Sequence, residues 1–148
     1  MTGVQTCALP ILEITGPSGV RTVPAGEFFL GFFESALQPD ELLTAVRVPR
    51  TGSAAWGYQK FVRRANDWAI VGVAVQGQAV ALVNMGSTPL RATAVENALA
   101  SGASIADAAA LAAEGTSAGS DIHATKAYRE HLARVLVRRA LEDAAARS

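Results

Sequence analysis

The chain has 148 residues, a formal net charge of zero, and 50% hydrophobic against 18% charged residues. This length and composition predict a globular protein with a sizeable core rather than a disordered chain. The sequence has no basic stripe that would favour nucleic-acid binding, and its apolar runs are too short or too interrupted to span a bilayer.

Residues 1–11 are treated separately, because Thr2–Ile11 equals the translation of a DNA sequence that resembles a common sequencing-library adapter. We interpret this segment as an adapter-derived artefact and leave it out of the fold prediction. A signal-like leader is the alternative, although the segment has no basic n-region and only a short apolar part. The single cysteine, Cys7, lies inside it, so the sequence supports no disulfide framework, cysteine nucleophile or cysteine metal site. We expect a cytoplasmic location.

The segment 12–52 reads as short strands and turns. We expect a hairpin (Leu12–Thr15 and Val20–Val23), a helical turn (Ala25–Phe29) and a strand (Leu42–Val48). Four phenylalanines, Phe28, Phe29, Phe32 and Phe33, hold most of the aromatic content, and we expect at least two of them in a core. The small-residue run 51–55 predicts a domain boundary.

The segment 53–148 predicts three strands followed by helices. The strands are Trp56–Val62, Trp68–Val75 and Ala79–Met85, and the helices are Ala92–Ala100, Ile105–Glu114 and a long one from Ala124. The tight connection at 76–78 makes the last two strands antiparallel. On the long helix, an apolar stripe through Leu132 and Leu136 predicts the buried face, with Arg129 on another face. The fold class predicted is α+β.

Four motifs follow one another along the chain: Phe28–Gly31 with Leu37–Thr44 and Val46–Pro49, then Tyr58–Ala74, Asn84–Ala92, and Tyr128–Leu141. In this order they resemble the FAD-binding (medium) subunit of molybdenum hydroxylases, the family of the carbon monoxide dehydrogenase and xanthine dehydrogenase flavoproteins. The resemblance implies the tail of a PCMH-type FAD-binding domain at 12–52. It also implies a flavoprotein C-terminal domain at 53–148, a three-stranded antiparallel sheet packed with C-terminal helices.

The resemblance also implies a function. In this family the subunit passes electrons from iron–sulfur clusters through FAD to an acceptor, within a molybdenum-containing oxidoreductase complex. Its partners are a molybdopterin-binding large subunit and an iron–sulfur small subunit. The family's pyrophosphate-binding glycine motifs belong to a portion that this sequence does not contain. We therefore expect a C-terminal fragment.

Four cofactor-binding residues follow from the resemblance alone: Leu43, Lys60, Arg64 and Asp67. The loop that carries Arg64 and Asp67 is about one residue shorter than in xanthine dehydrogenase. An ammonium such as that of Lys60 would stabilise the anionic reduced flavin. The alternative for Lys60 is an edge-strand lysine that protects the sheet, and for the loop a solvated hairpin end.

The sequence predicts no catalytic side chain and no metal site. The two histidines, His123 and His131, are eight residues apart, and no nucleophile motif is present. Two functions remain open: a fragment of the electron-transfer flavoprotein subunit, or a non-catalytic subunit-interaction module that binds no flavin by itself. Flanking coding sequence with glycine-rich FAD motifs would favour the first.

Overall fold

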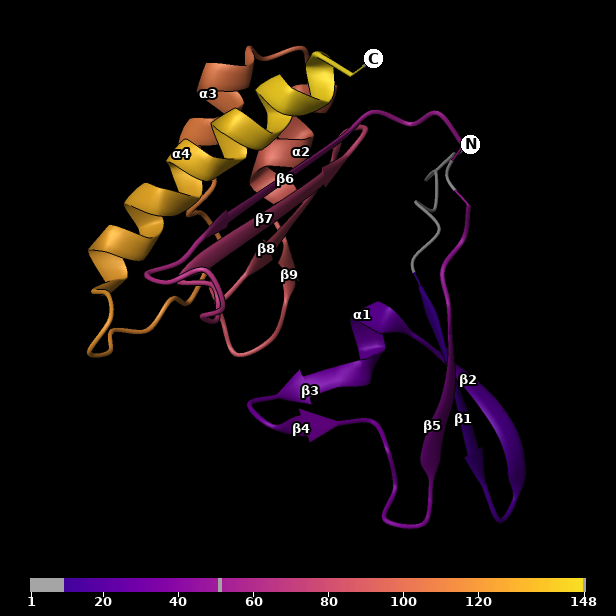
Figure 1. Ribbon diagram of the computed structural model, residues 1–148. Helices are drawn as coiled ribbons and strands as arrows, with labels where there is room; N and C mark the ends of the chain where they lie inside the picture. Colours follow the sequence, from indigo (N-terminus) through magenta and orange to yellow (C-terminus); the bar gives the residue numbers. More distant parts are fainter. Residues whose placement is uncertain (1–9, 51, 148) are drawn as a thin grey trace. The chain divides into compact units, whose positions relative to one another are not determined.

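The computed structural model describes residues 10–50 and 52–147 and divides the chain into two compact units (Figure 1). Unit 1 is Met1–Gly52 and unit 2 is Ser53–Ser148. Antiparallel sheets occur in both units, and in unit 2 the helices pack on one face of the sheet. The predicted α+β class is confirmed.

Unit 1 is built on a three-stranded antiparallel sheet in the order β2-β1-β5. Its elements are β1 (Ile11–Gly16), β2 (Gly19–Pro24), α1 (Ala25–Phe28), β3 (Phe29–Gly31), β4 (Glu34–Ser35) and β5 (Leu42–Arg47). The predicted hairpin, helical turn and strand are therefore present. The sequence analysis did not predict the second hairpin, β3–β4. A small core of Leu12, Ile14, Val23 and Phe28 lies in this unit.

Strand β1 begins at Ile11, one residue before the predicted start of the folded segment at residue 12. Ile11 pairs with Pro24 on one side and Arg47 on the other, and the Pro10 carbonyl accepts a bond from the Ala25 amide at 2.8 Å. Leaving Ile11 out of the fold prediction was wrong, because strand pairing uses backbone groups that every residue carries. Residues 1–9, including Cys7, lie outside the described residues, so the adapter interpretation stays a hypothesis.

The expectation that two or more phenylalanines enter the core was wrong. Phe28, at the end of α1, is buried, whereas Phe29, Phe32 and Phe33 are 48%, 78% and 99% exposed. The physical reason is the unexpected hairpin. β3 and β4 form a two-stranded ribbon, and Phe33 lies in its turn with a φ of 60°.

Unit 2 holds a four-stranded antiparallel sheet in the order β6-β7-β8-β9. The strands are β6 (Trp56–Phe61), β7 (Val71–Gln76), β8 (Ala79–Val83) and β9 (Leu90–Arg91). The three predicted strands are present, and β9 adds a two-residue edge. β7 begins at Val71 rather than at Trp68, because the Ile70 amide bonds to the Phe61 carbonyl at 2.8 Å and closes a loop there.

Three helices follow the sheet: α2 (Thr93–Ala100), α3 (Ile105–Ala110) and α4 (Lys126–Ala145). Side chains cap two of them, because the Ser104 hydroxyl accepts from the Asp107 amide and the Thr125 hydroxyl from the Tyr128 amide. α3 ends at Ala110, short of the predicted Glu114, where i to i+3 backbone bonds tighten the chain into turns. Within the described residues, no helix combines the length and apolar character needed to cross a membrane.

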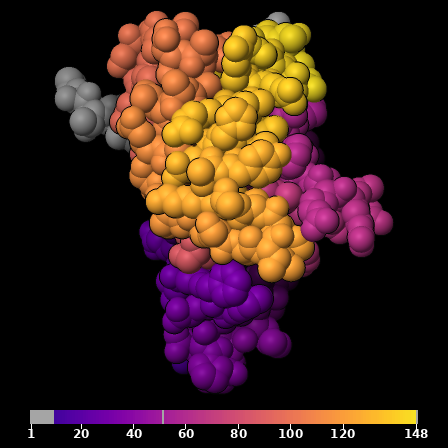
Figure 2. All heavy atoms as spheres, turned by 90° about the vertical axis from the view of Figure 1, so that its left-hand side faces the viewer, coloured from indigo at the N-terminus to yellow at the C-terminus, as the bar shows by residue number. Residues whose placement is uncertain are grey.

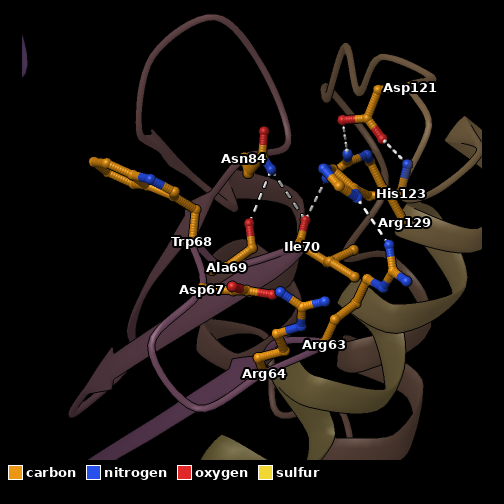
Figure 3. Close-up of a pocket in the computed structure, with 10 residues that line it drawn as sticks. All are labelled: Arg63, Arg64, Asp67, Trp68, Ala69, Ile70, Asn84, Asp121, His123 and Arg129. Atoms are coloured by element: carbon orange, nitrogen blue, oxygen red, sulfur yellow. Dashed lines mark hydrogen bonds and ion pairs between the residues drawn. The ribbon is translucent and has the colours of Figure 1, made fainter.

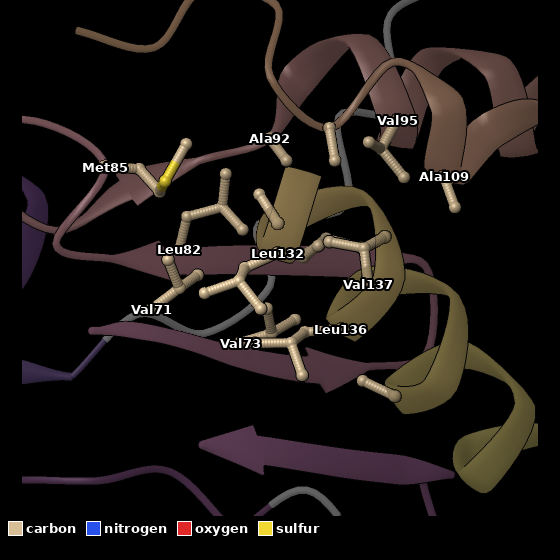
Figure 4. Close-up of a cluster of buried hydrophobic side chains, with 14 of the residues drawn as sticks. Val71, Val73, Leu82, Met85, Ala92, Val95, Ala109, Leu132, Leu136 and Val137 are labelled. Carbon is tan, nitrogen blue, oxygen red and sulfur yellow. The ribbon is translucent and has the colours of Figure 1, made fainter. Parts of the chain in front are cut away.

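The core of unit 2 lies between the sheet and the helices (Figure 4). Val73 and Leu82 from the sheet and Leu136 and Val137 from α4 are all buried, and burying such a side chain contributes about 1.5–3 kcal/mol. The predicted stripe through Leu132 and Leu136 is correct. The placement of Arg129 on another face was wrong, since its side chain is buried, at 3% exposure.

Candidate functional site

The loop 62–70 joins β6 to β7 and is closed at its base. The Ile70 amide bonds to the Phe61 carbonyl, and within the loop the Asp67 amide bonds to the Arg64 carbonyl at 3.0 Å. Residues 63–66 are exposed, and in the space-filling view the loop stands out from unit 2 as a magenta lobe (Figure 2). The sheet therefore presents a polar loop on a rigid base, a common arrangement for binding residues.

A cavity of about 390 Å³ lies beside this loop (Figure 3). Its walls come from the loop, from the turn after β8 and from the segment before α4. The lining residues are Arg63, Arg64, Asp67, Trp68, Ala69, Ile70, Asn84, Asp121, His123 and Arg129. The lining holds three guanidinium groups and two carboxylates, and one of each, Arg129 and Asp121, form an ion pair with each other, which leaves Arg63, Arg64 and Asp67 to face a ligand.

Arg129 is buried because both ends of its planar fork are occupied. One nitrogen donates to the Ile70 carbonyl and the other to the Asp121 carboxylate, each at 2.5 Å. A buried charge needs such partners, and the guanidinium geometry supplies two directed bonds at once. The helical pattern of α4 gives no sign of these partners, because Ile70 is 59 residues away and Asp121, eight residues upstream, lies before the helix begins.

Asp121 anchors the segment before α4. One carboxylate oxygen accepts from the backbone amides of His123 and Ala124, at 2.8 and 2.9 Å. These amide bonds, first that of His123, and the charge of Arg129 lower the pKa of the Asp121 carboxyl below its ordinary value. The carboxylate thus stays ionised. Its bond to the His123 amide positions the imidazole of that residue, and the imidazole Nδ1 accepts a hydrogen bond from Arg63 at 3.2 Å.

The structure brings Arg64 and Asp67 together at the cavity. Within the described part of the chain, the Arg64 guanidinium makes no hydrogen bond or ion pair, and it is therefore available to a ligand. Lys60 lies on β6, opposite Gly72 of β7. Its neighbours Gln59 and Phe61 face α4, so the exposed Lys60 side chain is on the sheet face away from that helix.

Leu43 belongs to unit 1. It lies on β5 opposite Ile14, next to an irregularity in the β1–β5 register, and 41% of it is exposed. The structure thus groups Arg64 with Asp67 in one cavity and places Lys60 on the adjoining strand. Leu43 lies in the other unit.

Sequence reasoning missed two residues at this site. Trp68 was assigned to a strand, yet it lies in the loop on the cavity rim and is 95% exposed. His123 was considered only for its spacing from His131, whereas its ring accepts a bond from Arg63. The signal available for Trp68 was its position directly after a charged run. No local signal pointed to His123, because its partner lies 60 residues away.

The described residues include no group of three His, Cys, Asp or Glu side chains suited to a metal ion. For a flavin the fit is partial. The exposed Trp68 indole and the Arg64 guanidinium, unpaired among the described residues, suit a flat ring system that gains negative charge on reduction. The described residues offer no glycine-rich loop before a helix for a pyrophosphate.

Comparison with known proteins gives the family. The family model for the CO dehydrogenase flavoprotein C-terminal domain matches residues 56–144, and that for the FAD binding domain in molybdopterin dehydrogenase matches residues 9–51. The chain belongs to the CO dehydrogenase flavoprotein family. The resemblance seen in the sequence motifs is therefore confirmed.

Individual relatives match this chain over both units. The carbon monoxide dehydrogenase medium chain of Afipia carboxidovorans is 34% identical, over all of this chain and 56% of its own length. The nicotine 6-hydroxylase medium subunit of Paenarthrobacter nicotinovorans is 30% identical, over 93% of this chain and 53% of its own. A crystallised CO dehydrogenase from Hydrogenophaga pseudoflava matches with a TM-score of 0.86 and 35% identity, over 94% of this chain and 53% of that one. The chain spans about half the length of these relatives.

Proposed function

We propose that this flavoprotein-family chain is part of the FAD-binding electron-transfer subunit of a molybdenum hydroxylase, in which electrons pass from iron–sulfur clusters through FAD to an acceptor. The observation that carries the proposal is the loop 62–70, where the Arg64 guanidinium, unpaired among the described residues, and the exposed Trp68 indole border one cavity. The family matches on both units support it. FAD, when bound, supplies the redox chemistry.

This chain's own residues would hold the ring end of the flavin. Trp68 offers a flat apolar face to stack against, and Arg64 offers hydrogen-bond donors to carbonyl oxygens. The Lys60 ammonium would favour the reduced anion, and the Asp67 carboxylate would orient polar edges of the ring. Leu43 would pack an apolar side chain against the ring. Each of these roles is a proposal for the complete subunit.

The proposed complex contains a molybdopterin-binding large subunit and an iron–sulfur small subunit, with this chain's subunit between the clusters and the acceptor. The names of the relatives support a multi-subunit assembly, since they are medium chains and medium subunits. The cytoplasmic location expected from the sequence stays a prediction.

A second candidate function is a subunit-interaction module. The β3–β4 hairpin favours it, because Phe32 and Phe33 in its turn are 78% and 99% exposed. Apolar side chains exposed to this extent are typical of surfaces that dock a partner. Flavin content separates the two functions. A complete subunit, made by grafting a relative's N-terminal portion onto this chain, should purify yellow with stoichiometric FAD. A colourless graft that still assembles with the other subunits would favour the interaction module.

The test of the flavin site is Lys60→Met in the grafted subunit. At 4 Å and an effective dielectric of 20, the ammonium–anion attraction is about 4 kcal/mol before desolvation. A net of about 1–2 kcal/mol would lower a two-electron flavin potential by roughly 20–40 mV. Arg139→Met, which removes one exposed charge from α4, is the control. If spectroelectrochemical titration gives both variants the same potential, the assignment of Lys60 to the flavin site is wrong.

A further inference from the structure

The loop 62–70 is held at both ends by residues that lie outside it. At its C-terminal end, the Ile70 carbonyl accepts from Arg129 of α4. At its N-terminal end, Arg63 donates to His123, which Asp121 fixes through its backbone amide. Asp121 in turn binds Arg129. These contacts close a ring through side chains from three separate parts of the fold (Figure 3).

Asn84 reinforces the same end of the loop. Its side-chain amide donates to the Ala69 carbonyl at 2.9 Å and to the Ile70 carbonyl at 3.3 Å. Its own backbone has a φ of 63°, a left-handed conformation that asparagine adopts more readily than most residues. The Ile70 carbonyl thus accepts from two side chains, and the turn after β8 is shaped to aim one of them.

The residue that anchors the loop and the residues of the loop itself differ strongly in solvent exposure. Arg129 is 3% exposed and donates two hydrogen bonds, whereas Trp68 in the loop is 95% exposed. Since residues 63–66 are exposed as well, the position of this part of the loop depends on the anchors. Burying a guanidinium costs desolvation free energy even when a carboxylate and a carbonyl bind it. An apolar residue at this position of α4 would avoid that cost. The arrangement therefore favours a role in setting loop geometry over a role in stability.

We propose that Arg129 is a positioning residue: through Ile70 on one side and through Asp121 and His123 on the other, it fixes the loop that presents Arg64, Asp67 and Trp68 to the flavin. The positioning itself concerns this chain's own contacts, and the mention of flavin rests on the proposed function. Helix α4 and the loop are thereby coupled, because any shift of α4 along the sheet moves the Ile70 end of the loop with it.

The first measurement is amide hydrogen exchange on the 148-residue chain, comparing the loop 62–70 with the strands 71–83. Arg129→Met should raise exchange in the loop by about tenfold or more relative to the strands, because the loop opens without global unfolding. Arg129→Lys should give a partial change, since an ammonium lacks the fork that reaches both partners. Arg139→Met, on the same helix and exposed, should change neither segment.

Two milder variants decide the matter if Arg129→Met does not fold. Asn84→Gly keeps the left-handed backbone and removes the bonds to Ala69 and Ile70. Asp121→Asn keeps an oxygen for the His123 amide and removes the charge that pairs with Arg129. Both should raise loop exchange selectively. If the loop and the strands change by the same factor in these variants, or the loop does not change, Arg129 is only a structural residue and the proposal is overturned.

A second measurement separates this proposal from the proposed function. In the grafted subunit, Arg129→Lys and Asn84→Gly should shift the flavin midpoint potential and its absorption bands, while Arg139→Met should not. A loop-selective change in exchange with no flavin response would support the positioning by Arg129 and would refute the placement of the flavin beside this loop.

Discussion

Gly57→Ala tests the packing of α4 on the sheet. A Cβ atom at position 57 would lie 2.0 Å from the Ala140 carbonyl oxygen, and side-chain carbons essentially never approach closer than 3.0 Å. The obstacle is helix backbone, so β6 and α4 must separate by about 1 Å at this point. Two bonds flank it: Gln59 to Asp143 at 2.7 Å and Arg147 to the Trp56 carbonyl at 2.8 Å. A separation of this size would take both beyond hydrogen-bonding distance.

The expected loss of stability combines overpacking, about 1–3 kcal/mol, with two weakened hydrogen bonds of about 0.5–1.5 kcal/mol each. We expect unit 2 to lose about 3 kcal/mol of unfolding free energy, or roughly 12–24 °C in melting temperature for a domain of this size. The assay is urea denaturation followed by circular dichroism at the helix band, because α2, α3 and α4 all belong to unit 2.

Gly119→Ala is the matched control, since a Cβ there meets nothing within 4 Å. It should stay within about 0.5 kcal/mol of the wild type. Sequence reasoning alone predicts the opposite sign at position 57, because replacing a strand glycine by alanine ordinarily reduces the entropy of the unfolded chain. A Gly57→Ala protein as stable as the control would refute the close approach of β6 and α4.

Two further predictions concern unit 1. Hydrogen bonds from Arg21 and then from the Gln38 amide lower the pKa of Glu41 from 4.5 to about 2, so its stabilising effect is complete above pH 4.5 and is lost as the pH falls toward 2. Glu41→Gln should therefore be less stable than the wild type at neutral pH. The difference in stability, measured by hydrogen exchange of the β2 and β5 amides, should shrink on acidification. A difference that does not change with pH would contradict the role of the carboxylate. Deleting residues 2–9 should leave the hydrogen exchange of these amides unchanged. Deleting residues 2–11 should increase it, because Ile11 pairs with Pro24 and Arg47. Equal effects of the two deletions would show that the start of the folded unit is not between residues 9 and 11.

The sequence by itself determined the elements whose causes are local. Turn residues between alternating runs gave the β1–β2 hairpin, the capping residue Ser104 marked the start of α3, and the spacing of Leu132 and Leu136 gave the buried face of α4. In each case the physical cause acts within a few residues, so it can be seen in a short window. The order of the motifs also pointed to the family.

The tertiary structure decided which side chains are buried and which form the candidate site. Arg129 is buried because the Ile70 carbonyl, 59 residues away, and the Asp121 carboxylate, in the segment before α4, pair with it, and the periodicity of α4 does not record either partner. Trp68 is exposed because the loop closes at Ile70 and the strand begins after it. Position 57 requires a glycine because a helix more than 80 residues later in the sequence packs closely against its strand. Long-range contacts set these features, and they exist only when the whole unit has folded.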